Sequence, residues 1–210
     1  MEPIYRLGYT LSNLVARLYF RRRVIHPEKL AVPGGCLVVA NHTSFLDPPM
    51  IGSAFPEAIH YMARKTLFSN KVADWIYRHC NAIPVNQERP ELATIKRILQ
   101  LVDQGEKVLI FPEGERTRDG QLKEKGAPGI GMLIAKSKKP ILPVRLYGAY
   151  EAFPRGAKIP KPSRLTVVAG DLLDLSELIE DADLKGKELY QALSDRAMEA
   201  IAELKLPEVT

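Results

Sequence analysis

Short apolar runs alternate along the chain with longer stretches in which apolar residues recur every three or four positions. The apolar runs predict buried strands, and the helical spacing predicts amphipathic helices. We expect strands at residues 36–40, 58–63, 81–86, 108–111, 141–146 and 165–169. We expect helices at residues 3–23, 49–55, 69–80, 90–104, 126–138 and 187–204. Because strands and helices alternate, the pattern predicts an α/β fold with a mixed, largely parallel sheet flanked by helices.

Two of these helices carry further expectations. In the helix at residues 69–80, the residues available for burial are Val72, Trp75, Ile76 and Tyr77. The N-terminal helix carries an apolar stripe at helical spacing, made of Ile4, Leu7, Leu11, Leu14, Val15 and Leu18. Polar residues interrupt that stripe, so the helix is a poor membrane span.

Aromatic residues and the basic cluster Arg21–Arg23 accompany the N-terminal stripe. Such an amphipathic helix either lies in the interface of a bilayer or docks on the core of its own protein. We expect residues 1–24 to form an amphipathic membrane-associated helix, monotopic or peripheral, on the cytoplasmic face. Residues 25–210 are then expected to form the remaining domain.

Composition narrows the class of partner. The 210 residues suit one domain, and a net charge of +5 suits an anionic partner such as a membrane surface or a phosphorylated substrate. No zinc spacing, helix-turn-helix or RNA-binding aromatic motif is present, so nucleic acid is not an expected partner. Cys36 and Cys80 are isolated in apolar surroundings and predict buried thiols in a reducing compartment.

The candidate chemistry begins directly after the strand expected at residues 36–40. His42 and Asp47 lie five residues apart, which would separate them on a regular helix. Working together, they require a turn between them, and a carboxylate on one imidazole nitrogen would make the other a general base. The attacking hydroxyl would then belong to a substrate. The alternative is a histidine near an unrelated aspartate.

A second motif, Phe111-Pro112-Glu113-Gly114-Glu115-Arg116-Thr117, follows the apolar run Val108–Ile110. Together with Asn41-His42 through Asp47-Pro48, it resembles the signature of the glycerolipid acyltransferase family. That family acylates glycerol 3-phosphate, lysophosphatidic acid and related lysolipids. Its later proline-containing apolar strand is similar to Ile141-Leu142-Pro143-Val144. The resemblance covers about residues 25–155 and makes residues 25–210 an expected acyltransferase domain.

The resemblance implies roles for individual residues. His42 would be the catalytic base and Asp47 its partner, with Glu113, Gly114, Arg116 and Thr117 binding the substrate. Arg116 is also the best phosphate ligand on chemical grounds, because a guanidinium group matches phosphate oxygens. Glu113 is expected to hold either Arg116 or the free hydroxyl of the substrate. Arg64 and Lys65 resemble a basic pair of the family, and either these cations meet the phosphate or they are surface charges.

The chain departs from the family pattern at one place. Gln87 stands where the family has an arginine that is thought to bind the glycerol phosphate of the acceptor. Arg89, two residues further along, could substitute for it. This departure leaves the identity of the acceptor open more than the type of reaction.

The expected function is transfer of a fatty acyl group from acyl-CoA or acyl carrier protein to 1-acyl-glycerol 3-phosphate. The product would be phosphatidic acid, in phospholipid biosynthesis, and neither a cofactor nor a metal is expected. Three alternatives stay open: another acceptor, such as glycerol 3-phosphate, a lyso-aminolipid or another lysophospholipid; a non-catalytic lipid-binding relative; and a hydrolase that activates water with the same two residues.

Overall fold

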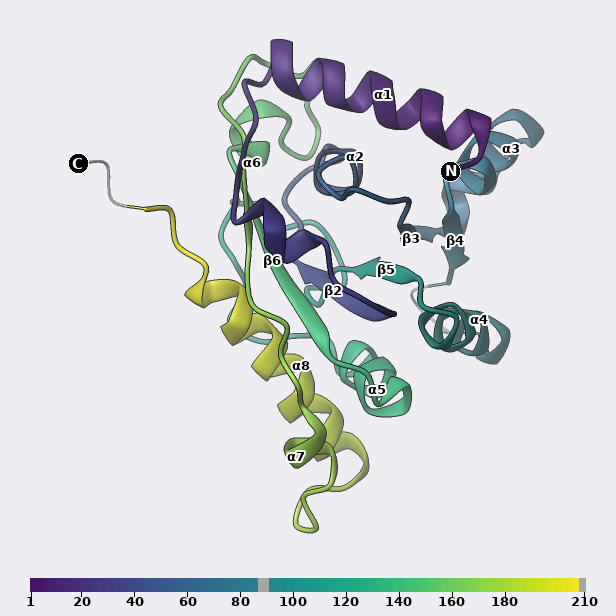
Figure 1. Ribbon diagram of the computed structural model, residues 1–210, viewed down its shortest axis with the longest axis vertical. Helices are drawn as coiled ribbons and strands as arrows, with labels where there is room; N and C mark the ends of the chain where they lie inside the picture. Colours follow the sequence, from purple (N-terminus) through teal and green to yellow (C-terminus); the bar gives the residue numbers. More distant parts are fainter. Residues whose placement is uncertain (87–90, 208–210) are drawn as a thin grey trace.

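A single twisted sheet organises the computed structural model, which describes residues 1–86 and 91–207 (Figure 1). The seven strands of the sheet run in the order β1-β7-β6-β2-β5-β3-β4. Their bounds are β1 Arg23–Ile25, β2 Cys36–Ala40, β3 His60–Arg64, β4 Ala82–Val85, β5 Lys107–Ile110, β6 Ile141–Tyr147 and β7 Thr166–Ala169. Only the β6–β7 pair is antiparallel within this sheet, so the predicted mixed, largely parallel α/β fold is confirmed.

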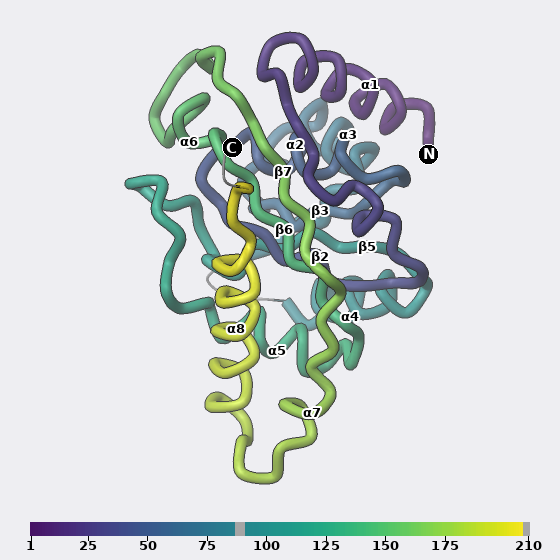
Figure 2. The backbone as a smooth tube through the Cα atoms, turned by 60° about the vertical axis from the view of Figure 1, so that its left-hand side comes forward, coloured from purple at the N-terminus to yellow at the C-terminus, as the bar shows by residue number. Residues whose placement is uncertain are grey.

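Helices cover both faces of the sheet (Figures 1 and 2). The α-helices are α1 Pro3–Leu18, α2 Asp47–Gly52, α3 Lys71–His79, α4 Leu92–Asp103, α5 Pro128–Ser137, α6 Ala149–Ala152, α7 Ser176–Ile179 and α8 Gly186–Glu203. Two short 3-10 helices, η1 Pro27–Leu30 and η2 Lys65–Phe68, complete the set within the described ranges.

The core is divided by the central strand. Along β2, Val38 and Ala40 face a cluster that includes α2 and the C-terminal end of α1, whereas Leu37 and Val39 face a cluster beneath α4, α5 and α8. This alternation follows from the pleat of a strand, which sends successive side chains to opposite faces. All five residues of β2 are fully buried, as expected for a strand covered on both sides.

Most elements form where the apolar pattern predicts them, with ends that shift by a few residues. Strand β1 is an exception, because residues 23–25 were expected to belong to the N-terminal helix or its connector. They pair instead in parallel with β7 at the edge of the sheet. The expected domain boundary between residues 24 and 25 therefore falls inside a strand.

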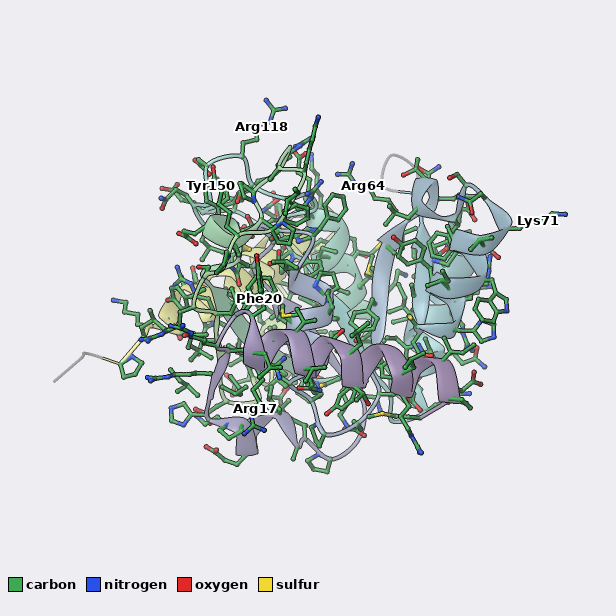
Figure 3. All side chains as sticks on the ribbon, turned by 90° about the horizontal axis from the view of Figure 1, so that it is seen from above. Arg17, Phe20, Arg64, Lys71, Arg118 and Tyr150 are labelled. Carbon is green, nitrogen blue, oxygen red and sulfur yellow. The ribbon has the colours of Figure 1, made fainter. Side chains whose placement is uncertain are left out.

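Helix α1 turns its leucines outward. Leu7 and Leu18 are 70% and 69% exposed, whereas Tyr5, Ala16 and Phe20 are buried. Figure 3 shows Phe20 directed toward the rest of the molecule and Arg17 directed away from it. The apolar stripe is thus present, but it does not dock on the core of this protein. None of the helices described here is long and apolar enough to cross a membrane.

Helix α3 corrects a second expectation. Val72, Trp75 and Ile76 were expected to be available for burial, but they are among the exposed apolar side chains. The helix lies at the β4 end of the sheet, where its main contacts are with η2, β4 and α1. Tyr77 packs against Phe68 on the inner side, with ring centroids 5.4 Å apart. No further layer covers the outer face of α3 in the described chain.

The close approach of α5 to α8 requires a glycine. A Cβ atom at Gly131 would lie 1.7 Å from the carbonyl oxygen of Tyr190, whereas one at Gly129 would meet nothing within 4 Å. We therefore predict that Gly131→Ala lowers the free energy of unfolding by about 2 kcal/mol or more, because the backbone of α8 must move. Gly129→Ala, in the same helix, should leave it unchanged or raise it by up to about 1 kcal/mol. Urea titrations would measure both, and equal effects would contradict this account of the packing.

Candidate active site

The turn between β2 and α2 brings His42 and Asp47 together. The carboxylate oxygen Oδ2 of Asp47 accepts hydrogen bonds from the backbone N–H groups of Thr43 and Ser44, at 2.7 and 2.8 Å. The same oxygen lies 2.8 Å from Nδ1 of His42. Because a carboxylate only accepts hydrogen bonds, Nδ1 carries the proton and Nε2 has a free lone pair. The expected pairing of these two side chains is present.

No hydroxyl or thiol group of the described residues forms a hydrogen bond with the free nitrogen of the dyad. Nε2 of His42 makes no hydrogen bond with the described residues, and the side chain is 19% exposed. The hydroxyl group of Ser44 is occupied, since it donates to the carbonyl oxygen of Phe153 at 2.8 Å and accepts from the N–H of Leu46 at 3.1 Å. Cys36 lies in the core, where burial raises the pKa of its thiol to about 11.

The turn that follows β5 forms hydrogen bonds with both the N–H and the carbonyl group of His42. Oε1 of Glu113 accepts a hydrogen bond from the N–H of His42 at 2.6 Å. The carbonyl oxygen of His42 accepts one from the N–H of Thr117 at 2.9 Å. The structure therefore joins the two motifs. Glu113 was expected to hold Arg116 or the substrate hydroxyl, but it binds the backbone of His42. Oε2 of Glu113 and Oγ1 of Thr117 are buried and have no partner in the described chain.

Glu113 is a carboxyl group in an apolar setting. Burial raises its pKa from 4.5 to about 7, with a small contribution from the charge of Asp47. The hydrogen bond from His42 and the nearby Lys123 act in the opposite direction and lower the pKa. Because burial dominates, a substantial share of Glu113 is protonated at neutral pH.

Arg116 lies at the rim of the same site. Its guanidinium group stacks over the ring of Phe45, with Cζ 3.6 Å from the ring centroid. Its NH1 atom is buried and has no hydrogen-bond partner within residues 1–86 and 91–207. Burial and the charges of Arg155 and Arg64 lower the pKa of this guanidinium. A group left in this state can accept an anion as its missing partner.

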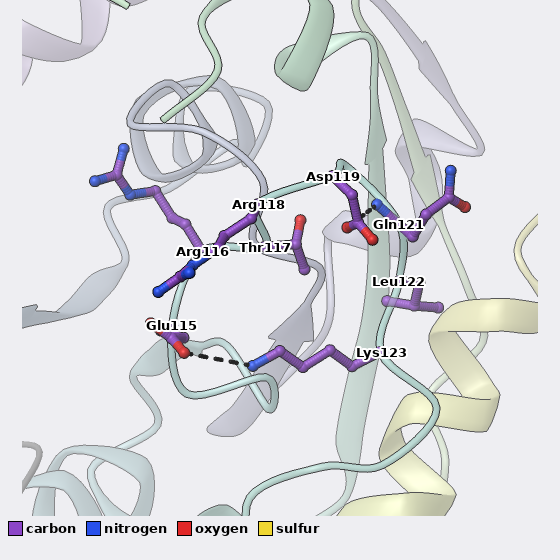
Figure 4. A pocket seen from close by; sticks show the side chains of 8 residues that line it. All are labelled: Glu115, Arg116, Thr117, Arg118, Asp119, Gln121, Leu122 and Lys123. Atoms are coloured by element: carbon purple, nitrogen blue, oxygen red, sulfur yellow. Dashed lines mark hydrogen bonds and ion pairs between the residues drawn. The ribbon is translucent and has the colours of Figure 1, made fainter. Parts of the chain in front are cut away.

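A pocket of about 320 Å³ opens beside this arginine (Figure 4). Its lining residues all come from the second motif and the loop after it: Glu115, Arg116, Thr117, Arg118, Asp119, Gln121, Leu122 and Lys123. Gly114, just before them, has φ +75°, a conformation that glycine adopts readily.

The remaining candidate substrate-binding residues are the cations Arg64, Lys65 and Arg89. Arg64 ends β3, and its charge acts on Arg116. Lys65 forms an ion pair with Glu91 at 2.8 Å, so its charge already has a partner. Arg89 lies outside the described residues. Whether any of these cations binds substrate stays a prediction.

Sequence reasoning missed two side chains at this site. Phe45 lies inside the first motif, and its aromatic ring supports Arg116. Arg155 lies in the loop after α6 and forms an ion pair with Glu115 at 3.4 Å. The signal for Phe45 was an aromatic residue inside a motif, and the signal for Arg155 was a basic residue after a proline. The described chain holds no cluster of three or more His, Cys, Asp or Glu residues that could bind a metal ion.

Known proteins resemble this chain over most of its length. A family model described as Acyltransferase matches residues 21–147. The 1-acyl-sn-glycerol-3-phosphate acyltransferase of Bacillus subtilis is 30% identical over 203 residues, which cover 96% of this chain and 97% of the relative. The enzyme of the same name from Streptococcus pneumoniae is 33% identical over 115 residues, 53% of this chain and 41% of the relative.

A solved structure supports the fold independently. The crystal structure of the 1-acyl-sn-glycerophosphate (LPA) acyltransferase PlsC from Thermotoga maritima matches with a TM-score of 0.75 and 21% identity. The match covers 98% of this chain and 81% of that chain. At this level of identity the likeness shows a shared fold.

The raised pKa of Glu113 predicts a pH-dependent stability. The folded state binds a proton that the unfolded state releases above pH 4.5, so this contribution falls as the pH rises from 4.5 to about 7. A shift from 4.5 to about 7 corresponds to about 3 kcal/mol. Glu113→Gln keeps an acceptor for His42 but cannot titrate. We therefore predict that the variant gains up to about this much stability relative to the parent protein over that range.

Chemical denaturation at several pH values would measure this difference. A difference in unfolding free energy that stays constant between pH 4.5 and 8 would contradict the buried, raised carboxyl group. Glu124→Gln makes the same change at an exposed carboxyl group and is the control for general effects of pH on the fold.

Proposed function

The chain belongs to the acyltransferase family, and we propose that it acylates the free hydroxyl of 1-acyl-glycerol 3-phosphate from an acyl thioester. The product would be phosphatidic acid, a precursor in phospholipid biosynthesis. One observation carries the proposal. His42 is oriented by a buried carboxylate, and its other nitrogen has no hydrogen-bond partner among the described residues. A base without its own nucleophile suits a reaction in which the substrate supplies the hydroxyl.

The chemistry follows from this arrangement. Nε2 of His42 takes the proton of the acceptor hydroxyl as its oxygen attacks the thioester carbonyl. Asp47 stabilises the resulting imidazolium through Nδ1. The tetrahedral intermediate then collapses, the carbon–sulfur bond breaks, and the imidazolium returns its proton to the departing thiolate. No covalent intermediate with the protein is needed, since Ser44 is engaged elsewhere and Cys36 is buried.

The acceptor phosphate is proposed to bind at Arg116. The stacked guanidinium is preorganised by Phe45, and its unpaired NH1 atom supports a role in binding an anion. The donor is acyl-CoA or acyl carrier protein, and the net charge of +5 suits either, because both are acidic.

We further propose that α1 rests on the surface of a membrane. Its outward leucines and the exposed arginines at positions 17, 21 and 23 support an interfacial position. The cytoplasmic face is proposed because Cys36 and Cys80 are free thiols, as is usual in a reducing compartment.

The reaction can be tested with purified protein, a labelled acyl donor and lysophosphatidic acid in mixed micelles. We predict phosphatidic acid and free thiol in equal amounts, with both acyl-CoA and acyl carrier protein tried as donors. His42→Ala should lower the rate about a thousandfold, since it removes the general base. Asp47→Asn should also lower it strongly, since it removes the charge that stabilises the imidazolium.

His79→Ala removes a histidine from α3 and is the matched control, with an unchanged rate. Thiol release without a lipid product would indicate a hydrolase instead. Full activity of His42→Ala would contradict the mechanism. Activity with glycerol 3-phosphate but not with lysophosphatidic acid would replace the proposed acceptor.

The interfacial position of α1 predicts the behaviour of charged variants. Intact protein should float with vesicles that contain phosphatidylglycerol, whereas the double variant Leu11→Glu, Leu14→Glu should remain at the bottom of the gradient. Burying a carboxylate in the bilayer interface is costly, and the charge opposes that of the lipid. Leu172→Glu, at another exposed leucine, is the control and should float. Flotation of the double variant would show that another surface binds the vesicles.

A further inference from the structure

A short segment after β6, residues 149–155, closes the site on a third side. It contains α6 and is fixed to the turns that carry the two motifs. The carbonyl oxygen of Phe153 accepts a hydrogen bond from Ser44 in the first turn at 2.8 Å. The hydroxyl group of Tyr150 donates to the carbonyl oxygen of Arg118 in the second turn at 2.8 Å. Figure 3 shows Tyr150 and Arg118 on the same side of the molecule.

The sheet explains why these segments meet. Strands β6, β2, β5 and β3 are consecutive neighbours and all parallel. Their carboxyl ends therefore lie along one edge, where parallel α/β sheets bind ligands. Segment 149–155 follows β6, the first motif follows β2, the second follows β5, and Arg64 ends β3.

Arg155 extends from this segment toward the second motif. Its NH1 atom lies 3.4 Å from Oε2 of Glu115, the residue before Arg116. The two side chains are 38% and 48% exposed, so this ion pair is worth less than about 1 kcal/mol. A guanidinium group has five N–H donors, and this long contact leaves most of them available.

Arg116 is the arginine on which the other cations at this edge act. The charges of Arg155 and Arg64 both act on Arg116, and Arg155 has the stronger effect of the two. Like charges repel, so an anion bound beside Arg116 and Arg155 would relieve this repulsion. The buried NH1 atom of Arg116, unpartnered within the described ranges, is a second sign that a ligand belongs there.

We propose that Arg155 is a binding residue for the acceptor phosphate, acting with Arg116 on the phosphate group of the lysolipid. This inference rests on the proposed function, since it assigns a residue to the acceptor of that reaction. It also assigns a cation to the phosphate in a sequence that has Gln87 in place of the arginine expected from the family pattern. Glu115 then holds Arg155 beside the site until the phosphate arrives.

Equilibrium binding tests this assignment without any turnover. A short-chain lysophosphatidic acid, kept below its micelle concentration, is titrated into the full-length protein in the absence of acyl donor. Arg155→Ala should raise the Kd about tenfold, the effect of one lost hydrogen bond to a charged group. Arg155→Lys should recover part of the loss. Lys158→Ala removes the same charge three residues further along an exposed loop and should leave the Kd unchanged.

Glu115→Gln separates phosphate binding from a merely structural ion pair. Under this proposal the variant lowers the Kd, because it frees Arg155 and removes a negative charge near the phosphate. If Arg155 serves only to pair with Glu115, the variant weakens binding as Arg155→Ala does, which overturns the proposal. An unchanged Kd in Arg155→Ala, or an equal loss in Lys158→Ala, overturns it as well.

A second acceptor shows whether the phosphate is the group that Arg155 recognises. Monoacylglycerol has the same acyl chain and hydroxyls but no phosphate, so Arg155→Ala should not change its binding. Binding of lysophosphatidic acid with the expected Arg155 effect, but no formation of phosphatidic acid, would refute the proposed function and keep the assignment. No binding of lysophosphatidic acid to the parent protein would overturn the assignment.

Discussion

The structure of the site depends on one buried carboxylate oxygen. Oδ2 of Asp47 accepts three hydrogen bonds, two from backbone N–H groups of the preceding turn and one from the ring of His42. The backbone bonds shape the turn, and Asp47 is also the first residue of α2. One atom therefore shapes the turn after β2 and aims the imidazole. These three partners replace water at Oδ2, whereas Oδ1 is buried and has no hydrogen-bond partner in the described chain.

The local part of this arrangement could be predicted from the sequence. His42 and Asp47 are close in the chain, and the five-residue spacing already required a turn. The link from His42 to Glu113 could not be predicted atom by atom, because it depends on the register of two strands. Val39 pairs with Ile110, so β2 and β5 end within one residue of the same level. Only then does the carboxylate of Glu113 reach the N–H of His42 instead of Arg116.

Other features depended on information that periodicity does not contain. A helical stripe shows which residues share a face, but not what that face contacts. In α1 and α3 several large apolar residues are exposed, and strand β1 was too short to show an alternating pattern. The role of Arg155 could not be predicted for a related reason. Its role depends on the order of β6, β2 and β5 in the sheet, which a single sequence does not specify.

The attachment of α1 explains how its leucines can stay outside. Its inner side is held by polar contacts: the hydroxyl groups of Tyr5 and Tyr61 lie 2.9 Å apart, and Tyr9 donates to the carbonyl oxygen of Phe55 at 2.8 Å. Arg22, just after the helix, donates to the carbonyl oxygen of Met50 in α2 at 2.7 Å. These bonds, together with buried Ala16 and Phe20, fix α1 to the helix that begins with Asp47.

The leucines therefore contribute little to the docking of α1, because they do not face the domain. The leucines can be buried in another apolar environment, such as a membrane, while the helix stays packed on α2. In Figure 1, α1 crosses the end of the molecule where α2 and α6 also lie. The helix that carries the outward stripe is thus hydrogen-bonded, through Arg22, to the helix that begins with Asp47. A surface that takes up the leucines would contact the outer side of α1 and leave its contacts with α2 in place.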